Sequence, residues 1–141
     1  MAAGFLEAAD KLAGEGAYNR EAYFFLRDAL EATLKRRKKS RRESSGHVTP
    51  AELLDGFRQH ALQEFGPMAV TVLDFWGVRS CEDIGRMVFG LVDAGVFGKT
   101  EHDSLEDFRA GYDFDEAFAR PFRPESPILS KIASAGVRSG E

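Results

Sequence analysis

Apolar residues in the first part of the chain recur at the three- and four-residue intervals of amphipathic helices. One stripe comprises Ala22, Phe25, Leu26, Ala29, Leu30 and Thr33, and Asn19 before it is a suitable N-cap. The helix is expected to continue into Lys35 to Lys39, because cations near a helix C-terminus oppose its dipole favourably. An earlier set, Phe5, Leu6, Ala9 and Leu12, predicts a short opening helix that Gly14 and Gly16 close.

The segment Thr49-Pro50-Ala51-Glu52 marks the start of another helix. It supplies an N-cap threonine, a proline at the first helical position and a glutamate three residues after the cap, which together form a capping box. An apolar stripe follows, made of Leu53, Leu54, Phe57, Ala61, Leu62 and Phe65. Gly66-Pro67 then ends this helix, and Pro67 can open the next one.

Two further helices are predicted on tight turns. The first is short, turns Ala69, Val72, Leu73 and Trp76 inward, and has Gly77 as a left-handed cap. Ser80 and Asp83 begin the second, which ends at Gly95. Its inward residues are Ile84, Met87, Val88, Leu91 and Val92.

The periodicity weakens after Gly95. The stretch 96–109 fits either a small hairpin or short helices, and helices are favoured because Ser104 with Asp107, and Asp113 with Glu116, resemble caps. Three prolines between Pro121 and Pro127, followed by small and polar residues, predict a mobile tail over 121–141. The expected fold is a compact all-α bundle of five to seven helices over 1–120, with most phenylalanines in its core.

Length and composition agree with one soluble domain, since the chain has 141 residues of which 43% are hydrophobic. The longest run without charge, Phe65 to Leu73, has nine residues, whereas a membrane span needs about 20. Glu7 and Asp10 interrupt the stretch where a secretory signal would be apolar. The single cysteine, Cys81, cannot form an internal disulfide, so we expect a cytoplasmic protein with no membrane contact.

Positive charge is concentrated in one segment. The net charge is −4, from 19 basic and 23 acidic residues, but seven of the basic ones lie in 35–42, so the rest holds 12 against 23, or −11. The seven are Lys35, Arg36, Arg37, Lys38, Lys39, Arg41 and Arg42. They are candidates to bind RNA or a ribonucleoprotein by counterion release, with little specificity because no aromatic residues are interleaved. The alternatives are a merely solvated helix end or a contact with an acidic protein.

Negative charge gathers further along the chain, where only Arg109 opposes it. The acidic residues are Glu101, Asp103, Glu106, Asp107, Asp113, Asp115 and Glu116. With exposed aromatic residues they could form the interface of a protein adaptor or a homo-oligomer. This is the alternative function to polyanion binding.

Catalytic and metal-binding patterns are weak. Cys81 stands at a helix N-terminus, where the dipole could acidify it, but nothing positions His60 or His102 as its base. His60 and Glu64 lie one helical turn apart, and two ligands are too few for a metal. We therefore expect a non-enzymatic protein with no catalytic residues, no metal and no cofactor.

The two helices around Gly77-Val78-Arg79 have the outline of a DNA-binding helix-turn-helix. Its second helix would carry Glu82, Asp83 and Asp93 against Arg86 alone. Phosphates would repel that net charge, so sequence-specific DNA binding is not expected.

Several segments between Tyr18 and Phe118 are distinctive, among them FGPMA, the WGV turn, AGVFGKT and YDFDEAF. On these segments the chain resembles a family of short uncharacterised bacterial proteins. The resemblance implies an intact fold over that range. The family has no assigned activity, cofactor or catalytic residue, so the resemblance implies none here.

Overall fold

The computed structural model describes residues 2–40, 48–98 and 104–122, and these form an all-α fold, as predicted. The six α-helices are α1 (Ala2–Glu15), α2 (Arg20–Ser40), α3 (Pro50–Phe65), α4 (Ala69–Phe75), α5 (Cys81–Asp93) and α6 (Leu105–Arg109). Three short turns complete the list: the 3₁₀ turn η1 (Gly66–Met68), the π-helical turn η2 (Asp115–Ala119) and the 3₁₀ turn η3 (Arg120–Phe122).

The helix starts follow the predicted local chemistry. Asn19 Oδ1 accepts a hydrogen bond of 2.8 Å from the amide of Glu21, which caps α2. At α3, the Thr49 amide donates to Glu52 Oε1 at 2.9 Å, and the Glu52 amide donates to Thr49 Oγ1 at 3.1 Å. The capping box is thus confirmed. The closing of α1 differs from prediction, because Gly14 lies inside the helix and only Gly16 follows it.

Two glycines with positive φ terminate helices as predicted. After α4, Gly77 has φ of 89°, its amide donates to Asp74 O at 2.9 Å, and the amide of Val78 donates to Leu73 O at 2.8 Å. This pair of bonds is a Schellman motif, which satisfies the last carbonyls of the helix. Gly95, with φ of 82°, ends α5 in the same manner.

The core collects the predicted inward faces of the helices. Its largest fully buried side chains are Phe57, Phe108, Phe118, Leu26, Leu73, Ile84, Met87, Leu91 and Val78. Phe25 of α2 lies 5.2 Å from the ring of Phe57 and 5.3 Å from that of Phe65, so aromatic contacts join α2 to α3. Phe75 and Phe122 depart from the expected packing role, since both are exposed.

Short helices rather than a hairpin follow α5 in the described part of the chain. Residues 105–109 form α6, and 99–103 lie outside the described residues. Gly85 lets α6 approach α5, because a Cβ there would stand 2.7 Å from Phe108 Cβ. Of the predicted tail, Pro121 and Phe122 belong to η3, and 123–141 lie outside the described residues.

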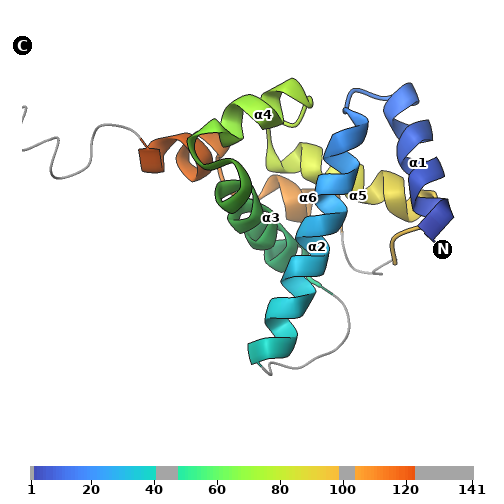
Figure 1. The fold of residues 1–141 in the computed structure, drawn as a ribbon, viewed down its shortest axis with the longest axis horizontal. Coiled ribbons are helices and arrows are strands. Elements are labelled where there is room, and N and C mark those ends of the chain that lie inside the picture. Colours follow the sequence, from blue (N-terminus) through green and yellow to red (C-terminus); the bar gives the residue numbers. More distant parts are fainter. Residues whose placement is uncertain (1, 41–47, 99–103, 123–141) are drawn as a thin grey trace, which may run out of the picture.

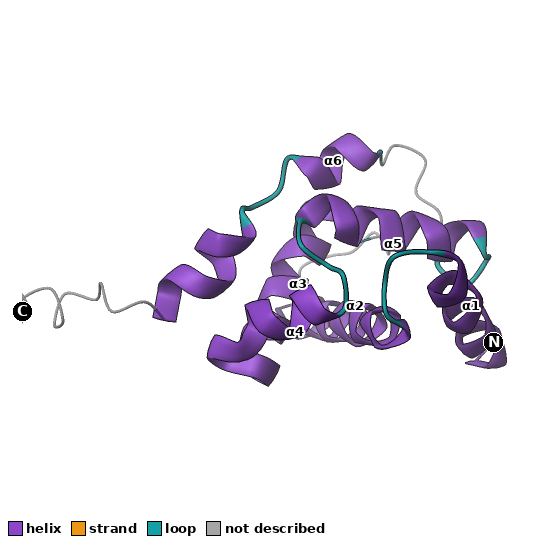
Figure 2. Cartoon of the chain, turned by 90° about the horizontal axis from the view of Figure 1, so that it is seen from above, coloured by secondary structure: helices purple, strands orange, loops and turns teal. Residues whose placement is uncertain are grey.

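In Figure 1, α2 passes in front of α5, α3 lies beside the lower part of α2, and α1 and η3 lie at opposite ends of the molecule. Seen from above, α5 lies between α6 on one side and α2 on the other (Figure 2). The C-terminal turns of α2 extend past the start of α3 (Figure 1). None of the helices in the described ranges is both long and apolar enough to cross a bilayer.

Candidate functional site

The contact between α2 and α3 determines which part of α2 extends from the body. Gly56 of α3 faces Thr33 of α2, and a Cβ at position 56 would collide with Thr33 Oγ1. Thr33 is buried, and its hydroxyl donates to Ala29 O at 2.8 Å, so it places no unpaired polar group in this contact. The two helices therefore touch closely at this level, and the basic residues begin just beyond it.

Of the seven cations of the basic segment 35–42, the structure describes the side chains of Lys35, Arg36 and Arg37. The surroundings of these three side chains differ. Lys35 and Arg36 are exposed residues, and Arg36 Nη2 donates to Thr33 Oγ1 at 3.5 Å. The Arg37 side chain is 18% exposed, and its Nε lies 3.4 Å from Glu52 Oε2. The segment is therefore not uniformly solvated, because Arg37 rests against the first turn of α3.

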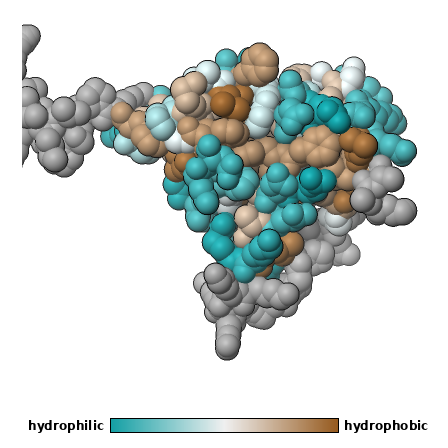
Figure 3. Space-filling model, viewed as in Figure 1, coloured by the Kyte–Doolittle hydropathy of each residue, from teal (hydrophilic) through white to brown (hydrophobic). Residues whose placement is uncertain are grey.

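The other predicted cations extend the same segment. Lys38 and Lys39 belong to the last turn of α2, which fits the prediction that the helix continues through the basic run, but their side chains are not described. Arg41 and Arg42 lie outside the described residues. Figure 3 shows hydrophilic residues over most of the lower body, from which α2 extends, and apolar ones mainly across the upper half.

Glu52 links the basic segment to α3 through both carboxylate oxygens. Oε1 accepts the Thr49 amide in the capping box, whereas Oε2 faces Arg37. The capping box alone was visible in the sequence. The ion pair joins residues on either side of a loop, and no local spacing indicates it.

The described acidic residues after α5 are used within the protein. Glu106 Oε2 accepts from Arg109 Nη1 at 2.5 Å. Asp107 Oδ2 accepts from the Ser104 amide at 2.8 Å, which confirms the predicted pairing of these residues at the start of α6. Both side chains therefore already make hydrogen bonds within the protein itself.

A similar arrangement holds at the start of η2. Asp113 Oδ2 accepts from the Glu116 amide at 3.1 Å, as predicted, and Glu116 Oε2 lies 3.5 Å from Arg120 Nη1. Asp115 is exposed. The remaining candidates of the acidic segment, Glu101 and Asp103, lie outside the described residues.

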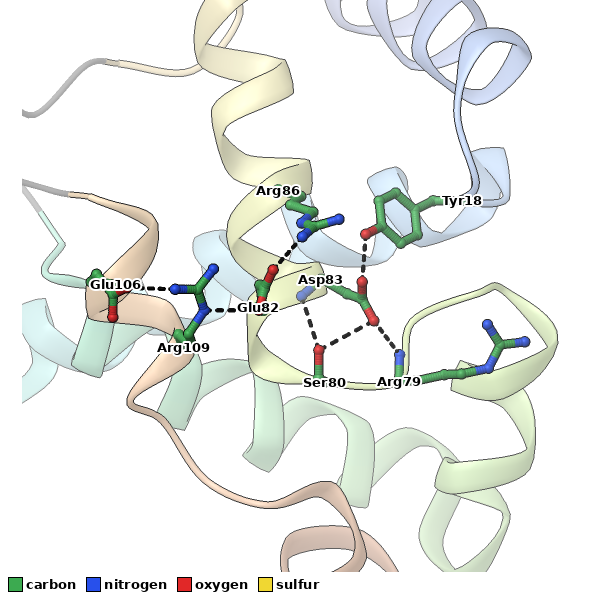
Figure 4. A network of polar contacts seen from close by, with 8 residues as sticks. All are labelled: Tyr18, Arg79, Ser80, Glu82, Asp83, Arg86, Glu106 and Arg109. Carbon is green, nitrogen blue, oxygen red and sulfur yellow. Dashed lines mark hydrogen bonds and ion pairs between the residues drawn. The ribbon is translucent and has the colours of Figure 1, made fainter.

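The N-terminal end of α5 holds a network of polar contacts centred on Asp83 (Figure 4). Its carboxylate accepts from Tyr18 Oη at 2.5 Å, from the Arg79 amide at 2.8 Å and from Ser80 Oγ at 3.3 Å. Burial, together with the hydrogen bond to Asp83, raises the pKa of Tyr18. The cap formed by Ser80 and Asp83 was predicted, but the tie to Tyr18 was not.

Glu82 extends this network toward α6. It pairs with Arg86 one turn along α5, and Oε1 accepts from Arg109 Nε at 2.9 Å (Figure 4). These bonds, from Arg109 first and Arg86 second, hold the pKa of Glu82 below its usual range. Because Arg109 also contacts Glu106, the positive charges here are shared among the protein's own carboxylates.

Cys81 is a packed thiol rather than a reactive one. It is 3% exposed, and its Sγ donates to Tyr112 O at 3.3 Å. Burial raises the pKa of Cys81 to about 11, against the lowering that a helix N-terminus would cause. The structure therefore does not support an acidified thiol at this helix N-terminus, because desolvation by burial raises the pKa of Cys81.

His60 contributes to aromatic packing. Its ring centroid lies 4.8 Å from that of Phe25, in the cluster that joins α2 to α3. Within the described ranges, no three side chains of the metal-ligating types His, Cys, Asp and Glu gather in a group. The pair of His60 with Glu64 is thus not supplemented there by a third such ligand.

Exposed apolar side chains mark one face of α4 that sequence reasoning missed. Phe75 is 78% exposed and Met68, at the end of η1, is 54% exposed. Val72 is half-buried between them along the helix, and the three residues share one face by their spacing. Of the residues predicted to face inward on this helix, Ala69 and Leu73 are fully buried, whereas Val72 and Trp76 are only half-buried.

Comparison with known proteins adds no family to this geometry: no protein-family model, curated protein or solved structure matches the chain. The resemblance over Tyr18 to Phe118 stays a prediction.

Proposed function

We propose that the protein is a non-enzymatic binding module that contacts a polyanion, RNA or a ribonucleoprotein, through the basic segment 35–42. The observation that carries this proposal is the extension of α2, with its basic residues, past the start of α3 (Figure 1). Cations grouped on a projecting element attract phosphates from a distance and release their counterions on contact. The exposure of Lys35 and Arg36 supports the proposal.

A salt titration tests it directly. Binding of a fluorescent RNA duplex is measured by anisotropy between 50 and 200 mM salt. If all seven cations contact phosphates, log affinity falls against log salt with a slope of about −6, and five contacts give about −4.5. A slope shallower than about −1 would discard the proposal, because one phosphate contact already contributes about −0.9.

Matched variants separate the basic segment from overall charge. The test variant carries Lys35→Gln, Lys38→Gln and Lys39→Gln, and should lose about three units of slope on duplex RNA. The control carries Lys11→Gln, Arg58→Gln and Arg120→Gln, which lowers the net charge equally at other places. Equal loss of affinity in both variants would show that the segment is not the binding site.

A second candidate function, contact with another protein or a second copy, is favoured by the exposed face of α4. Phe75 and Met68 are both exposed there, and aromatic residues and methionine are enriched at protein interfaces. Light scattering across salt concentrations tests this function. An assembly that persists in high salt and is lost in Phe75→Ser would support it, whereas a monomer under all conditions would exclude self-association.

A further inference from the structure

The carboxylate of Glu52 is held beside the basic segment by a bond that does not involve that segment. Oε1 accepts the Thr49 amide at 2.9 Å, which completes the capping box of α3. Oε2 lies 3.4 Å from Arg37 Nε. Because the capping bond positions the side chain, the negative charge stays near the end of α2 whether or not Arg37 remains in contact.

This placement sets a protein carboxylate against any phosphate that approaches Arg37. The Arg37 side chain is 18% exposed and that of Glu52 38%, so both remain partly accessible to a ligand. A phosphate at Arg37 would stand within a few ångströms of Glu52, well inside the Debye length of about 8 Å at physiological salt. Like-charge repulsion then opposes the contact.

We propose that Glu52 is an internal competitor of the polyanion, which weakens the contribution of Arg37 and so limits the affinity of the basic segment. This inference rests on the proposed function. Glu52 then has two roles: it caps the start of α3, and it weakens the binding of the polyanion. The segment then keeps weak, readily reversible affinity, because one of its cations is already faced by a carboxylate.

Glu52→Gln tests the inference with little disturbance of the fold. Glutamine at the third helical position still completes a capping box, but it removes the negative charge. RNA duplex affinity at physiological salt, about 150 mM, should rise about three- to tenfold, and the salt slope should become more negative by about 0.9, the value of one phosphate contact. Circular dichroism checks that helix content is unchanged.

Glu64→Gln is the matched control. It changes the net charge equally on the same helix, but 12 residues further along, about 18 Å at 1.5 Å per residue. That distance exceeds two Debye lengths at physiological salt, about 8 Å each. The control should leave the slope unchanged. If Glu52→Gln and Glu64→Gln have equal effects, overall charge explains the gain and the inference is overturned.

A double substitution assigns the effect to Arg37. In the presence of Glu52→Gln, the further change Arg37→Gln should abolish the gain in affinity, and alone it should cost less than it does in that background. A gain that persists without Arg37 contradicts competition for that side chain. If the unaltered protein binds with the expected slope but Glu52→Gln has no effect, only this inference fails. If the unaltered protein shows no salt-dependent binding, the proposed function fails as well.

Discussion

The two charged helix ends of this protein differ in how their charges are used. At the start of α5, Arg86 and Arg109 both face Glu82, and Asp83 accepts three hydrogen bonds. At the end of α2, the Glu52 carboxylate faces Arg37, while Lys35 is exposed. Charges that pair within the fold stabilise it locally, and charges that extend beyond it remain available to a ligand. The number of charged residues alone does not distinguish these cases.

The largest expected effect comes from separating α6 from α5. Phe108 is 2% exposed and packs against Gly85, which brings Arg109 to Glu82. Phe108→Ala should lower the free energy of unfolding by about 3–5 kcal/mol, because it leaves a cavity in the core. Urea denaturation measures this. Phe75→Ala, the same change at an exposed phenylalanine, is the control and should have little effect on stability. Equal losses would contradict the packing described here.

Removal of the Asp83 carboxylate should have the next largest effect. Asp83→Ala leaves Tyr18 Oη, Ser80 Oγ and the Arg79 amide without their acceptor, and hydrogen bonds to a charged group contribute about 1.5–3 kcal/mol. We expect a loss of about 2 kcal/mol in the free energy of unfolding. Asp93→Ala, at the C-terminal end of the same helix, should not destabilise the protein. A negative charge there interacts unfavourably with the negative end of the helix dipole, so its removal costs nothing.

Alkaline pH should weaken the same region through Cys81. Its pKa is about 11 in the folded protein against 9 for the unperturbed thiol, so folding favours the protonated form. The stabilisation is complete below pH 9 and is lost as the pH rises toward 11. By pH 10.5 the loss amounts to about 2 kcal/mol. Denaturation at several pH values measures this. Between pH 8 and 10.5, the free energy of unfolding should fall less in Cys81→Ala than in the unaltered protein, and the difference should be this amount. An identical drop in both proteins would show that the thiol does not contribute.

Most of the fold could be predicted because the signals are local. The Thr49–Glu52 capping box and the glycines at 77 and 95 specify where helices begin and end, and the apolar spacing specifies which faces are buried. These features depend on neighbours in the chain. The all-α class followed from them without knowledge of the packing.

The candidate site could be predicted only in part. The basic segment is visible as composition, but the contact between Arg37 and Glu52 depends on how α2 crosses α3, and that between Tyr18 and Asp83 joins residues 65 positions apart. Pairing of this kind depends on tertiary packing, which no spacing rule supplies. The sequence therefore indicated where cations gather, but not which of them the fold itself engages.

The smallest effect on stability is expected at the end of α2. Lys35→Gln should change the free energy of unfolding by no more than about 0.5 kcal/mol, because the residue is exposed. The same variant should lose one phosphate contact, which makes the slope of log affinity for duplex RNA against log salt shallower by about 0.9. Lys11→Gln, at an exposed site on α1, removes the same charge and should leave that slope unchanged. Two outcomes would contradict this prediction: a loss of more than about 1 kcal/mol in the free energy of unfolding of Lys35→Gln, or RNA binding by Lys35→Gln equal to that of Lys11→Gln. Either would show that the charge at the end of α2 acts within the fold, like the charges at the start of α5. That charge would then be no argument for binding.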